Sequence, residues 1–566
     1  MVVLRPGAKP PFGGLAALSD LTPMRRCKWR TMMREAGYRE AQPTRYRWIL
    51  DGLTEGVNIG YVGPRNESRT AKNQGSATAN PEVIAAIDAI IAADVAAGKK
   101  AGPFRDPPFA HFSVSPLSAV PKKPDEGKVQ TASDIRLVHN LSYPFNGNSI
   151  NAWSLDITTK LDSFEDAAAM VVRLGRDCYL TKIDVKAAYK LVPVRYEDWA
   201  LLGFRWRDQY YYERTLPFGL KSSCRQWEWY STALNACLCA LLGTPNIKHY
   251  IDDFLLAERV LSVAETHLAD TLKRAQSLGV PIAGNKTVGP ARCLTYLGVE
   301  IDTRAMTARL PEGKLRETIT TLKFWVSATQ ASRRELEKLT GFLHWAAKVV
   351  HPGRTFLRRI VDHMTALPTR YAREAIPDDV RLDIRWWHEN ISNANGVLLL
   401  YEEQWTDSNT IELTTDACDL GYGAAYGRRW IKNQWSADEQ RDARNGGTDD
   451  DPRRSMPYLE FLAIVYAAAT WGPLWARKRV NFRCDCMPVV HALADLQSRT
   501  PRMMRCVRAL HALSVRYHFD VKCTHIAGVD NIAADALSRD EMQRYRDLYE
   551  SPIDAMDPIG ELPRLL

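Results

Sequence analysis

The sequence predicts an α+β protein of several domains. Short apolar runs alternate with helical patterns over residues 155–305, and residues 310–390 repeat apolar side chains at helical spacing. A second alternation of strand-like and helical patterns runs from Ile411 to about Arg539. At roughly 100–200 residues per domain, a chain of 566 residues allows about three to five domains.

Changes in composition suggest where the domains begin and end. Residues 1–80 are rich in Gly, Pro and Arg and are expected to form a partly irregular N-terminal extension. A helix is predicted from Pro81 to Ala97, because Asn80 is a good N-cap and proline suits the first helical position. The other boundaries are predicted at 81–305 for the first α/β region, 306–392 for a helical domain, 393–409 for a linker, 410–545 for a second α/β domain and 546–566 for a tail.

The composition is that of an ordinary globular protein. Apolar residues make up 45% of the chain and charged residues 25%, which excludes a chain that is disordered, collagen-like or coiled coil throughout. The formal net charge of +9 suits a polyanionic partner, although such an excess also occurs in proteins without one. The 11 cysteines include no CxxC pair, which disfavours zinc ribbons and predicts free thiols in a reducing compartment.

Two uncharged stretches need to be weighed as membrane spans. Trp229 to Ile247 contains Ser, Thr, Asn, Gly and Pro, and Phe461 to Ala476 contains a Gly-Pro pair. Both are short for a span and are predicted to be buried helices. The N-terminus has no apolar signal core. The protein is therefore expected to be intracellular, in the cytoplasm or the nucleus, with no membrane partner.

Carboxylates stand at the ends of two apolar runs. Asp184 ends the run from Cys178, and the adjacent Asp252 and Asp253 interrupt the run that begins at Ile247. Adjacent acids inside a β-rich run are typical of a hairpin with the acids at its turn, although a solvated Asp-Asp turn is the alternative. Because strand side chains alternate, one of the two is expected to face a site shared with Asp184. Carboxylates from two strands can hold paired Mg²⁺ for phosphoryl transfer.

The residues around these acids resemble the motifs of reverse transcriptases. Tyr250-Ile-Asp252-Asp253 is similar to the YxDD catalytic hairpin, and Asp184 followed by Tyr189 is similar to the first palm motif. Other segments resemble the finger strands, the LPxG loop, the lysine motif near the triphosphate and the primer-grip hairpin, in that order: Ser115 to Lys123, Ile135 to Val138, Leu216 to Gly219, Gly279 to Lys286 and Leu294 to Val299. The resemblance implies a right-hand polymerase with fingers, palm and thumb.

The resemblance also implies roles for single residues. The metal ligands, for two Mg²⁺ ions with Mn²⁺ as an alternative, fall on Asp184, Val185, Asp252 and Asp253. The nucleotide contacts fall on Lys122, Arg136, Tyr189, Phe218, Gly219 and Lys286. Tyr189 would stand where a ribose 2′-hydroxyl would go and would filter for deoxynucleotides. A core aromatic is the alternative for this residue.

Within this family the sequence is most similar to the DIRS-like group of tyrosine-recombinase retrotransposons. Gypsy-like elements are the runner-up. The segments on which this subgroup prediction depends are Gly60 to Arg65, Asn80 to Val83, Gly102 to Phe104, Val138 to Pro144 and Pro352 to Arg354.

A second set of acids lies in the C-terminal α/β region. Residues 410–416 alternate with period two and end at Asp416, and Asp485 ends another strand. Glu460 is the single carboxylate of an apolar helix. Asp535 is predicted to lie on a helix capped by Asp530 or Asn531. Four carboxylates in one place are expected to raise one another's pKa, which favours an occupied cation site.

This order of acids resembles that of ribonuclease H, and Ala534 to Arg539 closely matches retroelement domains of that family. The resemblance implies an α/β ribonuclease H-like domain with a second two-Mg²⁺ site. His525 lies where the cellular enzymes carry a catalytic histidine. A loop histidine without catalytic role is the alternative. The charged stretch from Asp438 to Arg454 is expected to be an inserted loop.

Together the resemblances imply an RNA-directed DNA polymerase with linked ribonuclease H. The expected partners are an RNA template, a DNA primer, an RNA–DNA hybrid and dNTPs, with other retroelement proteins as further candidates. One alternative is a domesticated nucleic-acid-binding protein with one or both sites inactive, but every acid of both sets is present. Another is a polymerase without reverse transcription, against which Tyr189 and the second set of acids argue.

Overall fold

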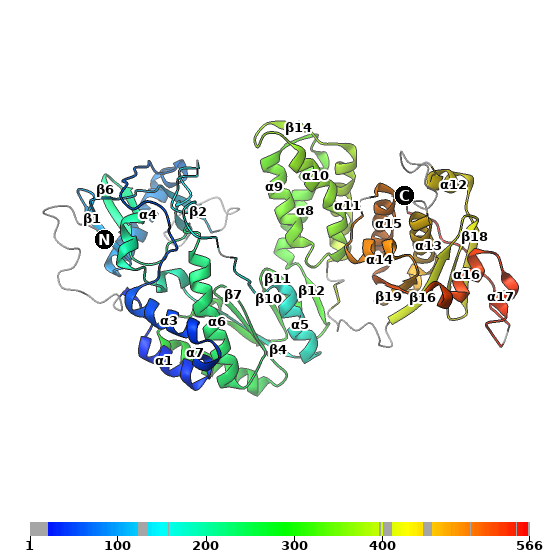
Figure 1. The fold of residues 1–566 in the computed structure, drawn as a ribbon, viewed down its shortest axis with the longest axis horizontal. Helices are drawn as coiled ribbons and strands as arrows, with labels where there is room; N and C mark the ends of the chain where they lie inside the picture. The colour runs from blue at the N-terminus through cyan, green and yellow to red at the C-terminus, as the bar shows by residue number, and fades with distance from the viewer. Residues whose placement is uncertain are drawn as a thin grey trace. The chain divides into compact units, whose positions relative to one another are not determined.

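The computed structural model describes residues 21–122, 134–145, 147–156, 158–395, 398–399, 410–444, 456–476, 478–498, 500–550 and 552–563. The chain divides into two compact units, Met1–Leu294 and Thr295–Leu566 (Figure 1). Both units combine helices with sheets, which confirms the predicted α+β class.

The first unit is built around a four-stranded antiparallel sheet, here called the palm sheet, in the order β7-β8-β4-β9. Its strands are β4 (Tyr179–Asp184), β7 (Ile247–Tyr250), β8 (Asp253–Glu258) and β9 (Val288–Ala291). Three helices pack against these strands: α5 (Phe164–Leu174), α6 (Ser223–Leu242) and α7 (Leu261–Leu278). The apolar face of α6 buries Trp227 and Tyr230 in the core, which fixes this helix beside the sheet.

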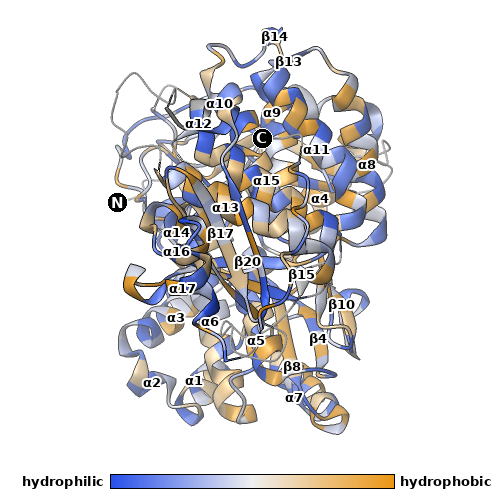
Figure 2. Ribbon diagram, turned by 90° about the vertical axis from the view of Figure 1, so that its right-hand side faces the viewer, coloured by the Kyte–Doolittle hydropathy of each residue, from blue (hydrophilic) through white to orange (hydrophobic). Residues whose placement is uncertain are grey.

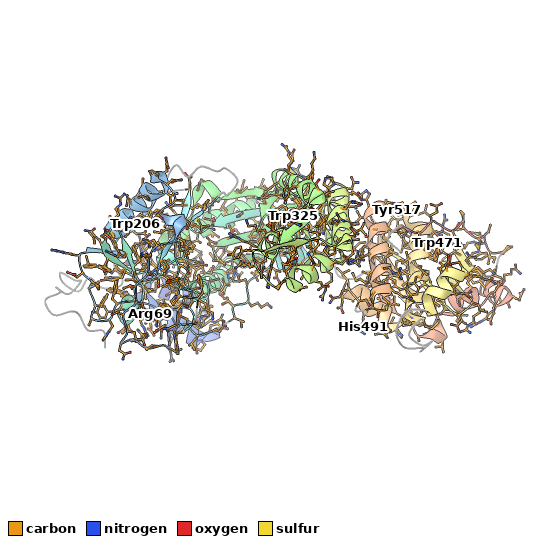
Figure 3. The ribbon with its side chains drawn as sticks, turned by 90° about the horizontal axis from the view of Figure 1, so that it is seen from above. Arg69, Trp206, Trp325, Trp471, His491 and Tyr517 are labelled. Carbon is orange, nitrogen blue, oxygen red and sulfur yellow. The ribbon has the colours of Figure 1, made fainter. Side chains whose placement is uncertain are left out.

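A smaller three-stranded sheet, the finger sheet, runs in the order β1-β6-β5. Its strands are β1 (Lys100–Phe104), β5 (Gly203–Trp206) and β6 (Gln209–Glu213), and a separate ribbon pairs β2 (Leu117–Pro121) with β3 (Ile135–His139). Helix α4 (Pro81–Ala96) covers them, and Asn80 Oδ1 accepts from the Val83 N–H as predicted for its cap. Trp206 Nε1 donates to Asp88 on α4 at 2.8 Å and ties the helix to β5 (Figure 3).

Three N-terminal helices lie within residues 1–80, for which the composition predicts a partly irregular extension. They are α1 (Arg26–Glu35), α2 (Tyr38–Ala41) and α3 (Pro43–Glu55). Trp29 of α1 is fully buried and meets Tyr230 of α6 edge-on, with ring centroids 5.8 Å apart. The N-terminal residues therefore complete the core of the first unit.

A helical bundle forms the first large part of the second unit. Its helices are α8 (Glu312–Ser327), α9 (Arg333–Ala346), α10 (Arg358–Ala366) and α11 (Asp378–Ala394), with the short strands β13 (Gln330–Ser332) and β14 (Arg373–Ala375) between them. Beside them a small sheet holds β10 (Cys293–Tyr296), β11 (Val299–Asp302), β12 (Thr307–Arg309) and β15 (Leu398–Leu399). Along α8 hydrophilic and hydrophobic residues alternate, as in a helix with one buried stripe (Figure 2). Apart from residues 398–399 in β15, most of the expected linker after Asn395 lies outside the described residues.

A five-stranded mixed sheet follows in the order β18-β17-β16-β19-β20. Its strands are β16 (Thr410–Ala417), β17 (Gly421–Tyr426), β18 (Arg429–Gln434), β19 (Arg479–Cys484) and β20 (Asp520–His525). The helices α13 (Met456–Trp471), α14 (Met487–Ala494) and α15 (Pro501–Tyr517) lie on one side of the sheet, and α16 (Ile532–Ser538) with α17 (Met542–Arg546) on the other (Figure 1). The expected inserted loop begins instead as a helix, α12 (Ala437–Arg444), and its residues 445–454 lie outside the described part.

The segment after α17 packs onto this domain. Trp471 Nε1 donates to Asp557 Oδ2 at 2.7 Å, and Trp430 Nε1 donates to the Asp554 carbonyl at 2.9 Å. A Cβ on Gly560 would lie 2.3 Å from the Ala469 carbonyl oxygen, so the backbones touch there. The predicted tail is thus bound to the domain over its described residues.

The two uncharged stretches are largely helical, as predicted, but each runs past its helix. Trp229 to Ile247 covers the rest of α6 and reaches the first residue of β7. Phe461 to Ala476 includes most of α13, whose side chains are mostly buried, and the turn after it. Among the described residues no helix combines the length and the apolar character that crossing a membrane requires.

Candidate active sites

The hairpin predicted around the adjacent aspartates is present in the palm sheet. Strands β7 and β8 pair antiparallel with Tyr250 opposite Asp253, and Ile251 at the turn has a φ of 57°. The Ile251 carbonyl accepts hydrogen bonds from Trp227 Nε1 at 2.9 Å and Ser231 Oγ at 2.6 Å, both on α6. A β-branched residue is strained in the left-handed region, so these two bonds hold the turn in its conformation.

Strand β4 brings Asp184 next to this turn. Asp184 is the register partner of Asp253, and the Val185 N–H donates to the Asp252 carbonyl at 2.9 Å. Burial raises the pKa of Asp252 to about 6, and the charges of Asp253 and Asp184 add to the rise. These three palm acids (Asp184, Asp252 and Asp253) form one cluster, whose mutual repulsion a divalent cation would relieve.

Two lysines neutralise part of this cluster. Lys286 Nζ donates to Asp184 Oδ2 at 2.8 Å, and this bond raises the pKa of Lys286. Lys182 Nζ lies 3.1 Å from Asp253 Oδ1. The sequence motifs pointed to Lys286 but not to Lys182. The alternation of side chains along β4 was the available signal, because it places Lys182 on the same face of the sheet as Asp184.

Tyr189 and the Phe218-Gly219 loop meet beside the palm acids. Tyr189 lies in the short 3₁₀ turn η4 (Ala188–Leu191), and its half-buried ring has its centroid 5.2 Å from that of Phe218. Burial raises the pKa of the Tyr189 hydroxyl, which keeps it neutral. Gly219 has a φ of 100°, and a Cβ there would lie 2.1 Å from the His139 carbonyl oxygen, so only glycine fits. Sequence reasoning missed Asn151, whose Nδ2 donates to the Gly219 carbonyl at 2.8 Å.

Lys122 and Arg136 lie apart from the palm sheet, on the β2–β3 ribbon. Arg136 is the register partner of Val120, and the Lys122 N–H donates to the Asp134 carbonyl at 2.8 Å. Both side chains are exposed. Residues two apart on a strand share a face with the partner opposite them, so the ribbon presents these two cations together.

The second set of acids gathers at one edge of the C-terminal sheet. Strands β16 and β19 run parallel, so their carboxyl ends, where Asp416 and Asp485 lie, meet at the same edge. Glu460 on α13, Cys484 and Asp485 offer ligand atoms within 4.8 Å of one another. Burial raises the pKa of Glu460 to about 9 and that of Asp416 to about 6, with repulsion from neighbouring acids adding to each rise. Such a donor set fits a divalent cation.

The pKa of Asp535, the fourth acid, is not raised as the mutual repulsion of four carboxylates predicts. Arg539 Nε donates to Asp535 Oδ1 at 2.6 Å, and Arg544 donates to Oδ2 at 2.7 Å. Burial alone would raise the pKa of Asp535, but these guanidinium groups outweigh it and hold the pKa below its usual value. The charge of Asp535 still raises the pKa of Asp416. We call these four residues the C-terminal acid cluster: Asp416, Glu460, Asp485 and Asp535.

His525 stands at the rim of this cluster. It ends β20 as the register partner of Cys484, and its side chain is exposed. In the loop that follows, a Cβ on Gly528 would lie 3.1 Å from Asp485 Oδ2, so this loop passes beside the acids. No sequence signal pointed to Cys484, which sits inside an apolar strand with its Sγ 3.8 Å from Glu460 Oε2.

Comparison with known proteins gives one family match. Residues 121–301 match the family model described as reverse transcriptase (RNA-dependent DNA polymerase). The Transposon Tf2-3 polyprotein of Schizosaccharomyces pombe is 21% identical over 390 residues, which is 66% of this chain and 25% of the polyprotein. The Enzymatic polyprotein of Figwort mosaic virus is 21% identical over 403 residues, which is 70% of this chain and 55% of that protein. The chain thus spans a quarter of the length of the transposon polyproteins it matches.

Solved structures of a foamy viral protease–reverse transcriptase also match. The complex with dsDNA is 14% identical with a TM-score of 0.46, covering 88% of this chain and 97% of that chain. The complex with an RNA/DNA hybrid is 13% identical with a TM-score of 0.45, covering 88% and 62%. The DIRS-like subgroup stays a prediction. The family match contains the palm acids, Tyr189 and Lys286, and residues 121–301 are therefore a reverse transcriptase domain.

Proposed function

We propose that this chain is a retroelement RNA-directed DNA polymerase that also degrades the RNA strand of an RNA–DNA hybrid. The observation that carries the first activity is the clustering of the palm acids within the reverse transcriptase domain. The template, primer, dNTPs and hybrid are part of the same proposal, as is a cytoplasmic or nuclear location.

The palm acids suit a pair of divalent ions. Asp184, Val185, Asp252 and Asp253 would hold two Mg²⁺, with Mn²⁺ as an alternative, and their oxygen-rich donor set supports this. When bound, such ions lower the pKa of an attacking hydroxyl or water and neutralise charge on the leaving group. Asp252, with a pKa of about 6, is ionised at neutral pH and available as a ligand.

The cationic residues of this domain suit the phosphates of a nucleotide and a primer. The Lys286 side chain is 60% exposed, so its ammonium group can leave Asp184 and contact a phosphate. Lys122 and Arg136 offer further positive charge on the ribbon, with Arg able to bond two oxygens at once. Tyr189 contacts the sugar in this proposal, where its ring excludes a 2′-hydroxyl.

The C-terminal acid cluster supports the second activity. Glu460, Asp416 and Asp485 would hold a second pair of Mg²⁺ ions at the sheet edge, with Asp535 contributing once the guanidinium groups around it are displaced. The exposed His525 beside this edge can move a proton or assist product release. This assignment would fail if a hybrid survived intact with the unmutated protein and Mg²⁺.

The proposal is tested by separating the two activities. Asp184→Asn or Asp252→Asn is expected to abolish primer extension on an RNA template while leaving hybrid cleavage, because the two sets of acids belong to different sheets. Primer extension near the unmutated rate by either variant would refute the palm assignment. A protein that binds template–primer but shows neither activity would favour the domesticated binding protein instead.

A further inference from the structure

A buried network of four charged side chains lies behind the nucleotide-binding residues of the reverse transcriptase domain. Its members are Asp94 on α4, Lys100 on β1, Lys190 on η4 and Glu213 on β6. Lys100 and Glu213 are cross-strand partners in the finger sheet, and α4 lies beside β1 (Figure 1). The side chains of Lys100 and Glu213 are 2% and 3% exposed, and that of Lys190 is 12% exposed.

Each cation of the network contacts both acids. Lys190 Nζ lies 2.6 Å from Glu213 Oε2 and 3.5 Å from Asp94 Oδ2. Lys100 Nζ lies 3.1 Å from Glu213 Oε1 and also bonds Asp94. The four formal charges cancel. Because a buried charge is tolerated only when it is paired, the network holds η4 and β6 at fixed positions relative to the consecutive elements α4 and β1.

One end of the network holds the turn that carries Tyr189. Lys190 is the next residue in η4, a single turn that follows Ala187 with its positive φ of 53°. Its ammonium group is anchored on Glu213, so a shift of the η4 backbone would stretch this ion pair or force the buried Lys190 stem into another conformation. The ring of Tyr189 therefore emerges from a turn that is fixed from its buried side.

The facing side of the Tyr189 ring is fixed as well. Phe218, whose ring contacts that of Tyr189, has its carbonyl bonded by the His139 N–H at 2.8 Å. The neighbouring Gly219 packs against the His139 carbonyl. With Phe218 held by β3, the Lys190–Glu213 pair is the charged contact that fixes the buried side of η4, beside the Thr22 hydroxyl, which donates to the Leu191 carbonyl at 2.6 Å.

We propose that Lys190 and Glu213 are positioning residues that set the discrimination between deoxyribonucleotides and ribonucleotides by holding η4 and Tyr189. This inference rests on the proposed function, in which Tyr189 contacts the sugar. A buried ion pair that served the fold alone would affect stability and leave sugar discrimination unchanged.

The test uses two matched double variants, each of which removes one cation and one anion and keeps the network neutral. Lys190→Met/Glu213→Gln removes the pair that holds η4. Asp94→Asn/Lys100→Met removes the pair between α4 and β1 and leaves the Lys190–Glu213 contact. The measurements are kcat/KM for single dNTP and rNTP incorporation, together with thermal denaturation, with Tyr189→Ala as the reference for loss of the filter.

The Lys190/Glu213 variant is expected to lower the dNTP-over-rNTP ratio of kcat/KM by about tenfold or more, in the direction of Tyr189→Ala, because displacement of a positioned group by about 1 Å has effects of this size. The Asp94/Lys100 variant is expected to lose similar thermal stability with an unchanged ratio. If both variants leave the ratio unchanged, or change it equally, the pair serves the fold alone and the inference is wrong.

The reference variant Tyr189→Ala distinguishes failure of the sugar filter from failure of the positioning role. Tyr189→Ala without any change in the ratio would overturn both the sugar filter and this inference, whereas a changed ratio in Tyr189→Ala but not in Lys190/Glu213 would overturn the inference alone. Should the double variant fail to fold, Glu213→Asp keeps the charge and shortens its reach by one methylene. This variant must then shift the ratio in the same direction, and an unchanged ratio would count against the positioning role.

Discussion

The Mg²⁺ affinity of the C-terminal acid cluster is expected to rise steeply between pH 7 and pH 9. Burial raises the pKa of Glu460 to about 9, and the charges of Asp416 and Asp485 add to the rise. Below that pH the Glu460 carboxyl holds a proton in the metal-free protein, and a metal ion must displace it. The apparent affinity therefore falls about tenfold for each pH unit below the pKa.

At pH 7 the gap of two units costs about 3 kcal/mol, or roughly 100-fold in apparent affinity relative to the fully ionised site. Relative to pH 9, where Glu460 is half ionised, the loss is roughly 50-fold. Asp416, with a pKa of about 6, adds a further loss only below pH 6. The direction in which pH changes the stability of the metal-free protein also follows from this pKa. Because the folded state holds the Glu460 proton more tightly than the unfolded chain, the metal-free fold loses stability as pH rises from the usual carboxyl pKa toward 9.

Calorimetric Mg²⁺ titration in two buffers with different ionisation enthalpies measures both the affinity and the protons released. The protein for this experiment carries Asp184→Asn and Asp252→Asn, so that the palm acids do not contribute. Release of about one proton at pH 7, about half a proton at pH 9 and almost none above about pH 10 is expected. In the control Glu460→Gln, that proton release and the pH dependence above pH 7 should both disappear. An Mg²⁺ affinity that stays constant from pH 7 to pH 9 would refute the reasoning.

Three further outcomes are expected. Asp416→Asn or Glu460→Gln should remove hybrid cleavage, whereas His525→Ala should only slow it. None of the three changes should affect primer extension. Cleavage by Asp416→Asn at the unmutated rate would contradict this. Gly423→Ala should lower hybrid cleavage and leave primer extension unchanged. Its methyl group would lie 2.4 Å from Leu537 Cβ and 2.7 Å from the Ala534 carbonyl oxygen. Such overpacking costs about 1–3 kcal/mol and displaces α16, which carries Asp535. Template–primer affinity, followed by fluorescence anisotropy, should fall by orders of magnitude across a salt titration because Lys and Arg contacts release counterions, and a flat titration would argue against a basic binding surface.

Strand ends and helix starts of this protein could be predicted from local sequence. Asp184 and Asp416 end runs whose apolar pattern is of strand type, and the structure has strands there. The helix after Asn80 begins as predicted because its cap and its proline act within one turn. Such signals depend on neighbouring residues only, and a single sequence therefore contains them in full.

Features that depend on distant partners could not be predicted in this way. Asn531 stands at the predicted cap position, yet its side chain donates to the Thr415 carbonyl at 2.9 Å instead of capping α16. The helices before residue 56 pack on distant elements, as Trp29 of α1 does on Tyr230 of α6, some 200 residues later in the chain. A local sequence pattern does not show which distant residue a side chain will contact.

The two sets of acids reduce their mutual repulsion in different ways, and this difference decides how each responds to pH. The palm acids are balanced by movable ammonium groups, because Lys286 bonds Asp184 and Lys182 lies beside Asp253. The C-terminal cluster is balanced by a proton on Glu460 and by guanidinium groups on Asp535. Metal binding at the palm would therefore displace an ammonium group and is expected to depend on pH as Asp252 titrates, near pH 6. Metal binding at the C-terminal cluster is expected to release a proton throughout the neutral range.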